Sequence, residues 1–295
     1  MTDAGGAGGG VVRINAAGKL VIDGQIAVGG GASNAAAGAG GSIALFGDVI
    51  SGVGLISADG GNTFSNGANG GGGGRVALVG NAVDPTLVSR ATARGGERRE
   101  QPFPTPQNNG AAGTIYVRRA GQSFGELIVD NLGLRTNHTT VLLSVGRGTV
   151  TALNSTQMTG DGDPFRYRLK GSWVAFNDDF SALWPIVTNA HKTSTLTLDV
   201  AGRPLTASIG DLYSGALRLD TLVVRGGSKA QVDDRALIAN LSVAPDSQWF
   251  PGNEQAPVVD ASKFRFEFGP FGLLLVGSAG AVVAPCSEAV VPTRI

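Results

Sequence analysis

Gly41-Ser42-Ile43-Ala44-Leu45 decides the fold, because its pattern occurs four times in the chain. The pattern is a glycine, any residue, an aliphatic residue, any residue and a second aliphatic residue. It also begins at Gly10, Gly74 and Gly113, so successive starts lie 31, 33 and 39 residues apart. Self-similarity at roughly this spacing is typical of repeat architectures, in which one small unit stacks on the next.

Short runs of alternating polarity follow each signature, at residues 19–23 and 24–28 and again at 48–51 and 54–58. A period of two predicts strands, so each unit holds about three. Three short strands cannot close a core alone, but units stacked about 4.8 Å apart pair each backbone with its neighbours. The repeats therefore predict a parallel β-solenoid in an all-β chain. The residues expected to point into one core are Ile14, Ile43, Leu45, Val76, Leu78, Ile115 and Val117.

Glycine-rich stretches end the units at residues 29–41 and 60–74. We favour loops or turns in which glycine supplies a positive φ and allows close approach of backbones, with an ordered lateral layer of glycine-rich segments as the alternative. In the third unit, residues 94–106 are charged and then proline-rich, which predicts a solvated loop with polyproline II character.

The pattern changes near Gly146, where the glycine clusters end. Residues 148–212 contain several short alternating runs, which predict a small antiparallel β-barrel-like module inserted into the solenoid of residues 1–147. We expect its separate core to hold Trp173, Phe176, Trp184 and Ile186. Residues 213–295 are expected to resume the solenoid rungs and to end in a C-terminal strand segment.

The segment Gly54-Leu55-Ile56-Ser57-Ala58-Asp59-Gly60-Gly61-Asn62, which leads to residues 70–78, resembles the glycine-rich β-helix repeats of large bacterial surface or secreted proteins. Gly113-Thr114-Ile115-Tyr116-Val117 and residues 127–131, 171–173 and 225–227 are similar to the segments that follow those repeats, so the resemblance spans roughly residues 1 to 250. The resemblance implies an adhesin-like or structural protein and supplies no catalytic residues.

The amino-acid composition excludes several classes of protein. Glycine occupies 47 of 295 positions, too many for a helical bundle and without the third-position period of collagen. Lys plus Arg and Asp plus Glu both number 23, so no net charge attracts nucleic acid or an anionic membrane. The lone Cys286 excludes an internal disulfide framework. No signal peptide is legible, and the apolar stretch 271–284 is too short to cross a bilayer.

Catalytic signatures such as Gly-x-Ser-x-Gly, His-Glu-x-x-His and Cys-x-x-Cys do not occur, so no catalytic residue or cofactor is predicted. The two histidines, His138 and His191, lie in polar contexts typical of exposed loops.

Asp161 and Asp163 are calcium candidates, since oxygen ligands at alternate positions suit that ion, although the further ligands of a strong loop are missing. The remaining paired carboxylates are expected to form turns. They are Asp178, Asp179, Asp233 and Asp234.

These features favour a structural or adhesive module of a bacterial extracellular or cell-surface assembly, not an enzyme. The alternative is a carbohydrate-binding or carbohydrate-cleaving β-helix, such as a phage tail component, which would take a glycan as partner. We expect residues 264–284 to pair with another copy or with a neighbouring domain, or else to fold back as a cap of this chain. The candidate assembly residues are Phe264, Phe266, Phe268, Leu273 and Leu275.

Overall fold

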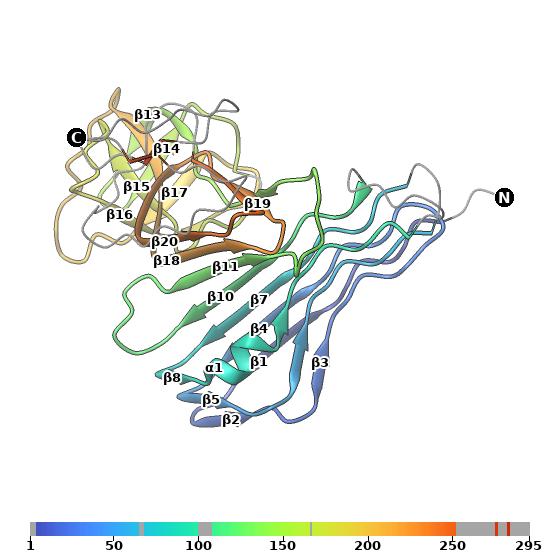
Figure 1. Ribbon diagram of the computed structural model, residues 1–295. Coiled ribbons are helices and arrows are strands. Elements are labelled where there is room, and N and C mark those ends of the chain that lie inside the picture. Colours follow the sequence, from blue (N-terminus) through green and yellow to red (C-terminus); the bar gives the residue numbers. More distant parts are fainter. Residues whose placement is uncertain are drawn as a thin grey trace, which may run out of the picture.

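The computed structural model describes residues 4–64, 68–99, 108–165 and 167–251, together with the backbone of residues 275–276 and 282–283. The protein is mostly β, with 43% of residues in strands and 3% in helices. One large mixed sheet and several small parallel sheets organise it (Figure 1).

The signature segments form parallel neighbours in the large sheet: β1 (Val11–Asn15), β4 (Ser42–Phe46), β7 (Arg75–Val79) and β10 (Thr114–Arg118). Val12 lies opposite Ile43, which lies opposite Val76, which lies opposite Ile115. Equivalent residues of successive units therefore stack directly on one another.

Two small parallel sheets complete each turn of the chain. The first contains β2 (Lys19–Val21), β5 (Val49–Ser51) and β8 (Ala82–Val83), and the second contains β3 (Gln25–Ala27), β6 (Leu55–Ser57) and β9 (Ala91–Thr92). A five-residue helix that the sequence pattern did not predict, α1 (Pro85–Ser89), links β8 to β9. Asp84 caps it by accepting a hydrogen bond from the Thr86 amide, and Leu87 is buried.

The aliphatic signature residues share one core, as predicted. Ile43, Leu45, Val76, Leu78, Ile115 and Val117 are buried in the same cluster, and half-buried Ile14 packs against it. Alternation along each strand places these side chains on the inner face.

The chain direction reverses after β10. β11 (Glu126–Asp130) pairs antiparallel with β10 and parallel with β18 (Leu212–Arg225), which pairs parallel with β20 (Arg235–Val243). Beside them, β12 (Thr140–Val141), β19 (Lys229–Gln231) and β21 (Gln248–Phe250) form a small parallel sheet. A second core, which includes Leu222, Ile238 and Trp249, lies between these strands.

A closed ring of antiparallel strands lies between β12 and β18 in sequence. Pairing runs from β18 through β13 (Arg147–Leu153), β14 (Gln157–Gly160), β17 (Thr195–Leu198), β16 (Trp184–Asn189) and β15 (Trp173–Phe176) back to β18. β18 is thus continuous from the ring into the parallel strands. After β21 in the sequence, β22 (Leu275–Val276) pairs antiparallel with β23 (Val282–Val283).

The ring has its own core, which includes Phe176, Trp184 and Ile186 as expected. Trp173 was wrongly assigned to it, because its side chain lies outside, with Ala175 and Ala216. Trp173 and Val174 are adjacent in β15, so they point to opposite faces and only Val174 enters the ring core.

The glycine-rich stretches form extended legs. After its third strand each turn runs outward (residues 29–33, 59–63 and 94–98), and a return leg leads to the next signature (residues 4–10, 36–41, 68–74 and 108–113). Figure 1 shows the legs running side by side away from the strands. We call the legs together the glycine layer.

Backbone hydrogen bonds cross the glycine layer in two directions. Gly40 donates to Gly72 along the stack (2.9 Å), whereas Gly38 donates across it to Gly31 (2.9 Å). A Cβ on Gly38 would lie less than 3.0 Å from the carbonyl oxygen of Ala7, so close approach requires glycine here.

Close approach of backbones was expected here and is confirmed, whereas the expected loops with positive φ were wrong. The described glycines with positive φ, such as Gly121 and Gly226, lie outside the legs. The alternative, an ordered lateral layer, describes the arrangement. Residues 94–98 are likewise an outgoing leg with Gly95 and Gly96 buried, rather than the start of a solvated loop. Residues 100–107 lie outside the described part of the chain.

Candidate functional site

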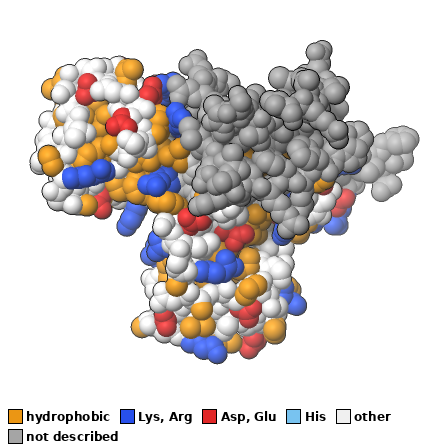
Figure 2. All heavy atoms as spheres, turned by 60° about the vertical axis from the view of Figure 1, so that its left-hand side comes forward, with side chains coloured by type: hydrophobic (Ala, Val, Ile, Leu, Met, Phe, Trp, Pro, Cys, Tyr) orange, Lys and Arg blue, Asp and Glu red, His pale blue; other side chains and the backbone are white. Residues whose placement is uncertain are grey.

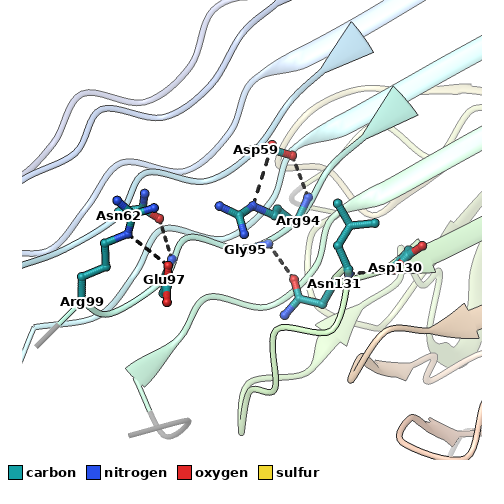
Figure 3. A network of polar contacts seen from close by, with 9 residues as sticks. Asp59, Asn62, Arg94, Gly95, Glu97, Arg99, Asp130 and Asn131 are labelled. Atoms are coloured by element: carbon teal, nitrogen blue, oxygen red, sulfur yellow. Dashed lines mark hydrogen bonds and ion pairs between the residues drawn. The ribbon is translucent and has the colours of Figure 1, made fainter. Parts of the chain in front are cut away.

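Buried polar side chains close one end of the glycine layer. Asn131, at the end of β11, is fully buried and accepts a hydrogen bond from the Gly95 amide (2.7 Å) through Oδ1. Its Nδ2 donates to the carbonyl oxygens of Gly110 (3.3 Å) and Leu134 (2.6 Å). The amide side chain thereby supplies hydrogen bonds that another glycine leg would make. Figure 3 shows the one that it accepts from Gly95.

Three more polar residues extend this closure. Thr136 and Thr140 donate through Oγ1 to the carbonyl oxygens of Asn109 and Ala112, both at 2.6 Å. The Asn109 side chain accepts from the Arg98 amide and donates to the Arg135 carbonyl oxygen, at 2.8 Å each. The last turn of the glycine layer is thus capped from within the chain.

Polar residues also link the second and third outgoing legs (Figure 3). Asp59 accepts from the Arg94 amide (2.9 Å), and its carboxylate lies 4.0 Å from the Arg94 guanidinium. Asn62 accepts from the Glu97 amide at 2.8 Å. These contacts fix the register of one leg on the next.

The opposite end, at the first turn, has a sheet edge that no other described strand covers. Within the described residues, β1, β2 and β3 each pair on one side only, with β4, β5 and β6. Val11 is 79% exposed. A parallel strand paired on one side presents a row of free N–H and C=O groups on the other.

The aliphatic core is also less buried at the first turn. Val12, Ile14, Leu20 and Ile26 are only partly buried, whereas Ile43, Leu45, Ile50 and Ile56 in the second turn are at most 1% exposed. An apolar core that ends half-exposed at a free sheet edge is the arrangement that another strand or subunit can cover.

The two calcium candidates, Asp161 and Asp163, lie in different environments. Asp161 accepts a hydrogen bond from the Thr149 amide (2.6 Å), and this bond lowers the pKa of its carboxyl group. Asp163 is exposed. The described residues contain no group of three or more His, Cys, Asp or Glu side chains that could hold a metal ion. Calcium binding here stays a prediction.

Asp179 matches the expected turn, because its carboxylate accepts a hydrogen bond from the amide two residues on, Ser181 (3.0 Å). Hydrogen bonds from the Ser181 side chain and backbone lower the pKa of Asp179. Asp178 also lies in a turn, with a φ of 57°, and its carboxylate accepts hydrogen bonds from Arg147 and Ser214 of two ring strands at 2.7 Å each. Asp233 accepts a hydrogen bond from Gln231 at 3.0 Å.

Asp234 holds the ring against the strands that follow it. Its buried carboxylate accepts hydrogen bonds from the Ser144 hydroxyl and from the amides of Val145 (2.7 Å) and Gly146 (2.8 Å). Burial raises its pKa, in spite of these bonds. No local sequence signal marks this role, because the partners lie about 90 residues away.

Sequence patterns also missed a cluster of aromatic and basic residues on the outer face of the ring. The Trp173 and Phe124 rings meet edge to face with centroids 5.7 Å apart, and the Arg218 guanidinium lies 3.9 Å from the centroid of Phe124. Asp220 accepts hydrogen bonds from the amides of Phe124 and Gly125 at 2.8 Å each. The cluster joins the β10–β11 hairpin to β15 and β18.

The two histidines are exposed, as expected. The side chains of the predicted assembly residues Phe264, Phe266, Phe268, Leu273 and Leu275 lie outside the described part of the structure.

No helix among the described residues is long and apolar enough to span a membrane. On the face drawn in Figure 2, acidic and basic side chains of the described residues are interspersed with hydrophobic ones, consistent with a net charge of zero. Comparisons with protein-family models, with curated proteins and with solved structures find no match to this chain.

Proposed function

We propose that the chain is a structural or adhesive module of a bacterial extracellular or cell-surface assembly. It acts through shape and through contacts between copies or neighbouring domains, not through turnover of a substrate. The observation that carries the proposal is the contrast between the two ends of the glycine layer. One end is capped by buried Asn131 and Asn109, whereas at the other end β1 pairs on one side only among the described strands and the core residues beside it are partly buried.

We also propose a finer description of the fold. Residues 1–147 form a parallel β-solenoid, residues 148–212 an inserted antiparallel β-barrel-like module, and residues 213–295 resumed rungs with a C-terminal strand segment. Parallel pairing of β1, β4, β7 and β10 supports the first part, and the ring of pairings that closes on β18 supports the second.

Stacking gives such a module stiffness. Each leg of the glycine layer bonds to its neighbours in two directions, and each signature strand bonds to the next turn. Bending the stack would break several of these bonds at once. A stiff element in which no described strand covers one end suits a component that spaces or joins other parts of a surface structure.

The full-length chain tests this proposal under reducing conditions, so that Cys286 forms no disulfide between copies. We expect sedimentation velocity to give a mass that rises with concentration and negative-stain microscopy to show particles joined end to end. A monomer at every concentration overturns the assembly role. Turnover of a bacterial polysaccharide by the same sample would overturn it in favour of the carbohydrate-processing alternative.

A further inference from the structure

We propose that the free edge of β1 accepts a strand from a second copy of this chain, supplied by Phe264-Arg265-Phe266-Glu267-Phe268. The inference rests on the proposed function and names the two surfaces that join copies head to tail.

Hydrogen bonds between the first and second turns show which backbone groups of β1 face β4. Ser42 donates to the Gly10 carbonyl oxygen (3.0 Å), and Ala16 donates to that of Phe46 (2.8 Å). Because bonding direction alternates along a strand, the amides of Val12 and Ile14 face β4. The amides of the odd-numbered residues of β1, including Arg13, therefore face away from it. They form the template to which an added strand can bond.

The side chains along this edge indicate which residue types an added strand needs. Val12 and Ile14 are half-buried, whereas their partners Ile43 and Leu45 are fully buried because another strand lies beyond them. An added strand with apolar residues on its inner face completes the same burial for Val12 and Ile14. Burial of apolar surface of this kind is the main source of strand association.

A further glycine turn does not fit this end. Ala7 is in register with Gly38, Gly71 and Gly110, and a Cβ on each of these glycines would lie less than 3.0 Å from a carbonyl oxygen of the preceding turn. The methyl group of Ala7 points the same way, so it blocks a preceding glycine leg. The occupant is therefore a strand that pairs with β1 alone.

Residues 264–268 match this requirement by sequence. Three phenylalanines alternate with Arg265 and Glu267, so an extended chain places all three rings on one face. The segment contains no glycine, unlike the legs. Glu267 brings a negative charge to the exposed side of β1, where Arg13 lies. The segment lies outside the described residues, and its sequence alone carries this step.

The test uses three full-length variants. Arg13→Pro removes one outward amide and leaves the hydrogen bonds to β4 in place. Arg13→Ala is the matched control, because it loses the same guanidinium over the Phe46 ring but keeps the amide. Phe266→Asp alters the supplied strand and leaves β1 intact. Circular dichroism establishes that each variant is folded.

We expect wild type to associate, and Arg13→Ala to associate more weakly because it lacks the charge that faces Glu267. Arg13→Pro and Phe266→Asp should each remain monomeric in sedimentation velocity. A mixture of these two variants should give dimers and nothing larger, because each retains one intact surface. Association of either variant at the wild-type level, or no dimer in the mixture, overturns the inference. The proposed function survives that result as long as the wild-type chain assembles.

A synthetic peptide of residues 261–270 gives a second measurement that does not depend on the folding of Arg13→Pro. We expect it to shorten wild-type assemblies by occupying β1, and the same peptide with Phe266→Asp to leave them unchanged. Equal effects of both peptides contradict the inference.

Discussion

The carbonyl oxygen of Gly10 lies where the side chain of residue 41 would begin, since a Cβ on Gly41 would be less than 3.0 Å from it. The relationship recurs between Gly74 and the carbonyl oxygen of Gly41 and between Gly113 and that of Gly74. The glycine that opens the second, third and fourth signatures is therefore required by close stacking of the turns, whereas a Cβ on Gly10, in the first, meets nothing within 4 Å. This requirement makes the spacing of the repeats a property of backbone contact as well as of the aliphatic core.

Adjacent glycines in one leg should respond differently to alanine. A Cβ on Gly73 would lie less than 3.0 Å from backbone atoms of Ala93 and Gly113, whereas a Cβ on Gly72 meets nothing within 4 Å. We expect Gly73→Ala to lower the free energy of unfolding by about 2 kcal/mol or more. Gly72→Ala should change it by less than about 1 kcal/mol. Denaturant unfolding measures both, and equal effects would mean that the legs are not packed as described.

The signature strands should not tolerate a buried charge. Val76 is 1% exposed in the first core, so Val76→Asp should destabilise the protein by about 4 kcal/mol or more. Its neighbour Ala77 points to the opposite face and is half-exposed, so Ala77→Asp should cost less than about 1 kcal/mol. Thermal unfolding of the pair checks the register of β7, and similar melting temperatures would contradict it.

The sequence pattern predicted the strands and inner residues because alternation is a local signal. Ile43 and Leu45 two positions apart identify the inner face of β4 without reference to any other turn. The conformation of the glycine legs was mispredicted because glycine adopts a positive φ as readily as an extended conformation. Only the neighbouring turn, about 30 residues away, decides between them.

Features that depend on distant partners could not be predicted from local sequence. Asn131 caps Gly95, which precedes it by 36 residues, and nothing in Asp130-Asn131 distinguishes a cap from an ordinary turn. Trp173 was expected in the ring core, yet the residue of this pair that points inward is its neighbour Val174. The ring of Trp173 contacts Phe124 in the β10–β11 hairpin, and the repeat pattern does not predict this hairpin.

The cap of the glycine layer should be costly to remove. Asn131→Ala leaves the Gly95 amide and two carbonyl oxygens without their partner, so we expect a loss on the order of 3 kcal/mol. Asn108→Ala removes a single partly buried hydrogen bond and should cost less than about 1 kcal/mol. Hydrogen exchange at the Gly95 amide should speed up in Asn131→Ala only. Unchanged exchange there would show that another group satisfies this amide.

The pKa values of three aspartates should be shifted in opposite directions from the ordinary value of this side chain. Burial raises the pKa of Asp234, so its contribution to stability is complete at acidic pH and is lost as pH rises through that value. Hydrogen bonds lower the pKa of Asp161 and Asp179, so their contributions are present at neutral pH and are lost on acidification. Carboxyl chemical shifts followed by NMR give all three in one experiment. A midpoint for Asp234 below that of Asp161 would contradict the account.

Removal of the antiparallel ring should leave the rest of the protein folded. Thr149 of β13 lies opposite Leu212 of β18 in antiparallel register, so a short Asn-Gly turn can join them in place of residues 150–211. The ring core shares no buried residue with the other two large cores. The deletion also removes Trp173 and Trp184 and leaves Trp249 as the only tryptophan, buried in the second core. We therefore expect fluorescence emission typical of a buried indole and a cooperative unfolding transition. Emission typical of a solvent-exposed indole before denaturation would show that the parallel strands depend on the ring.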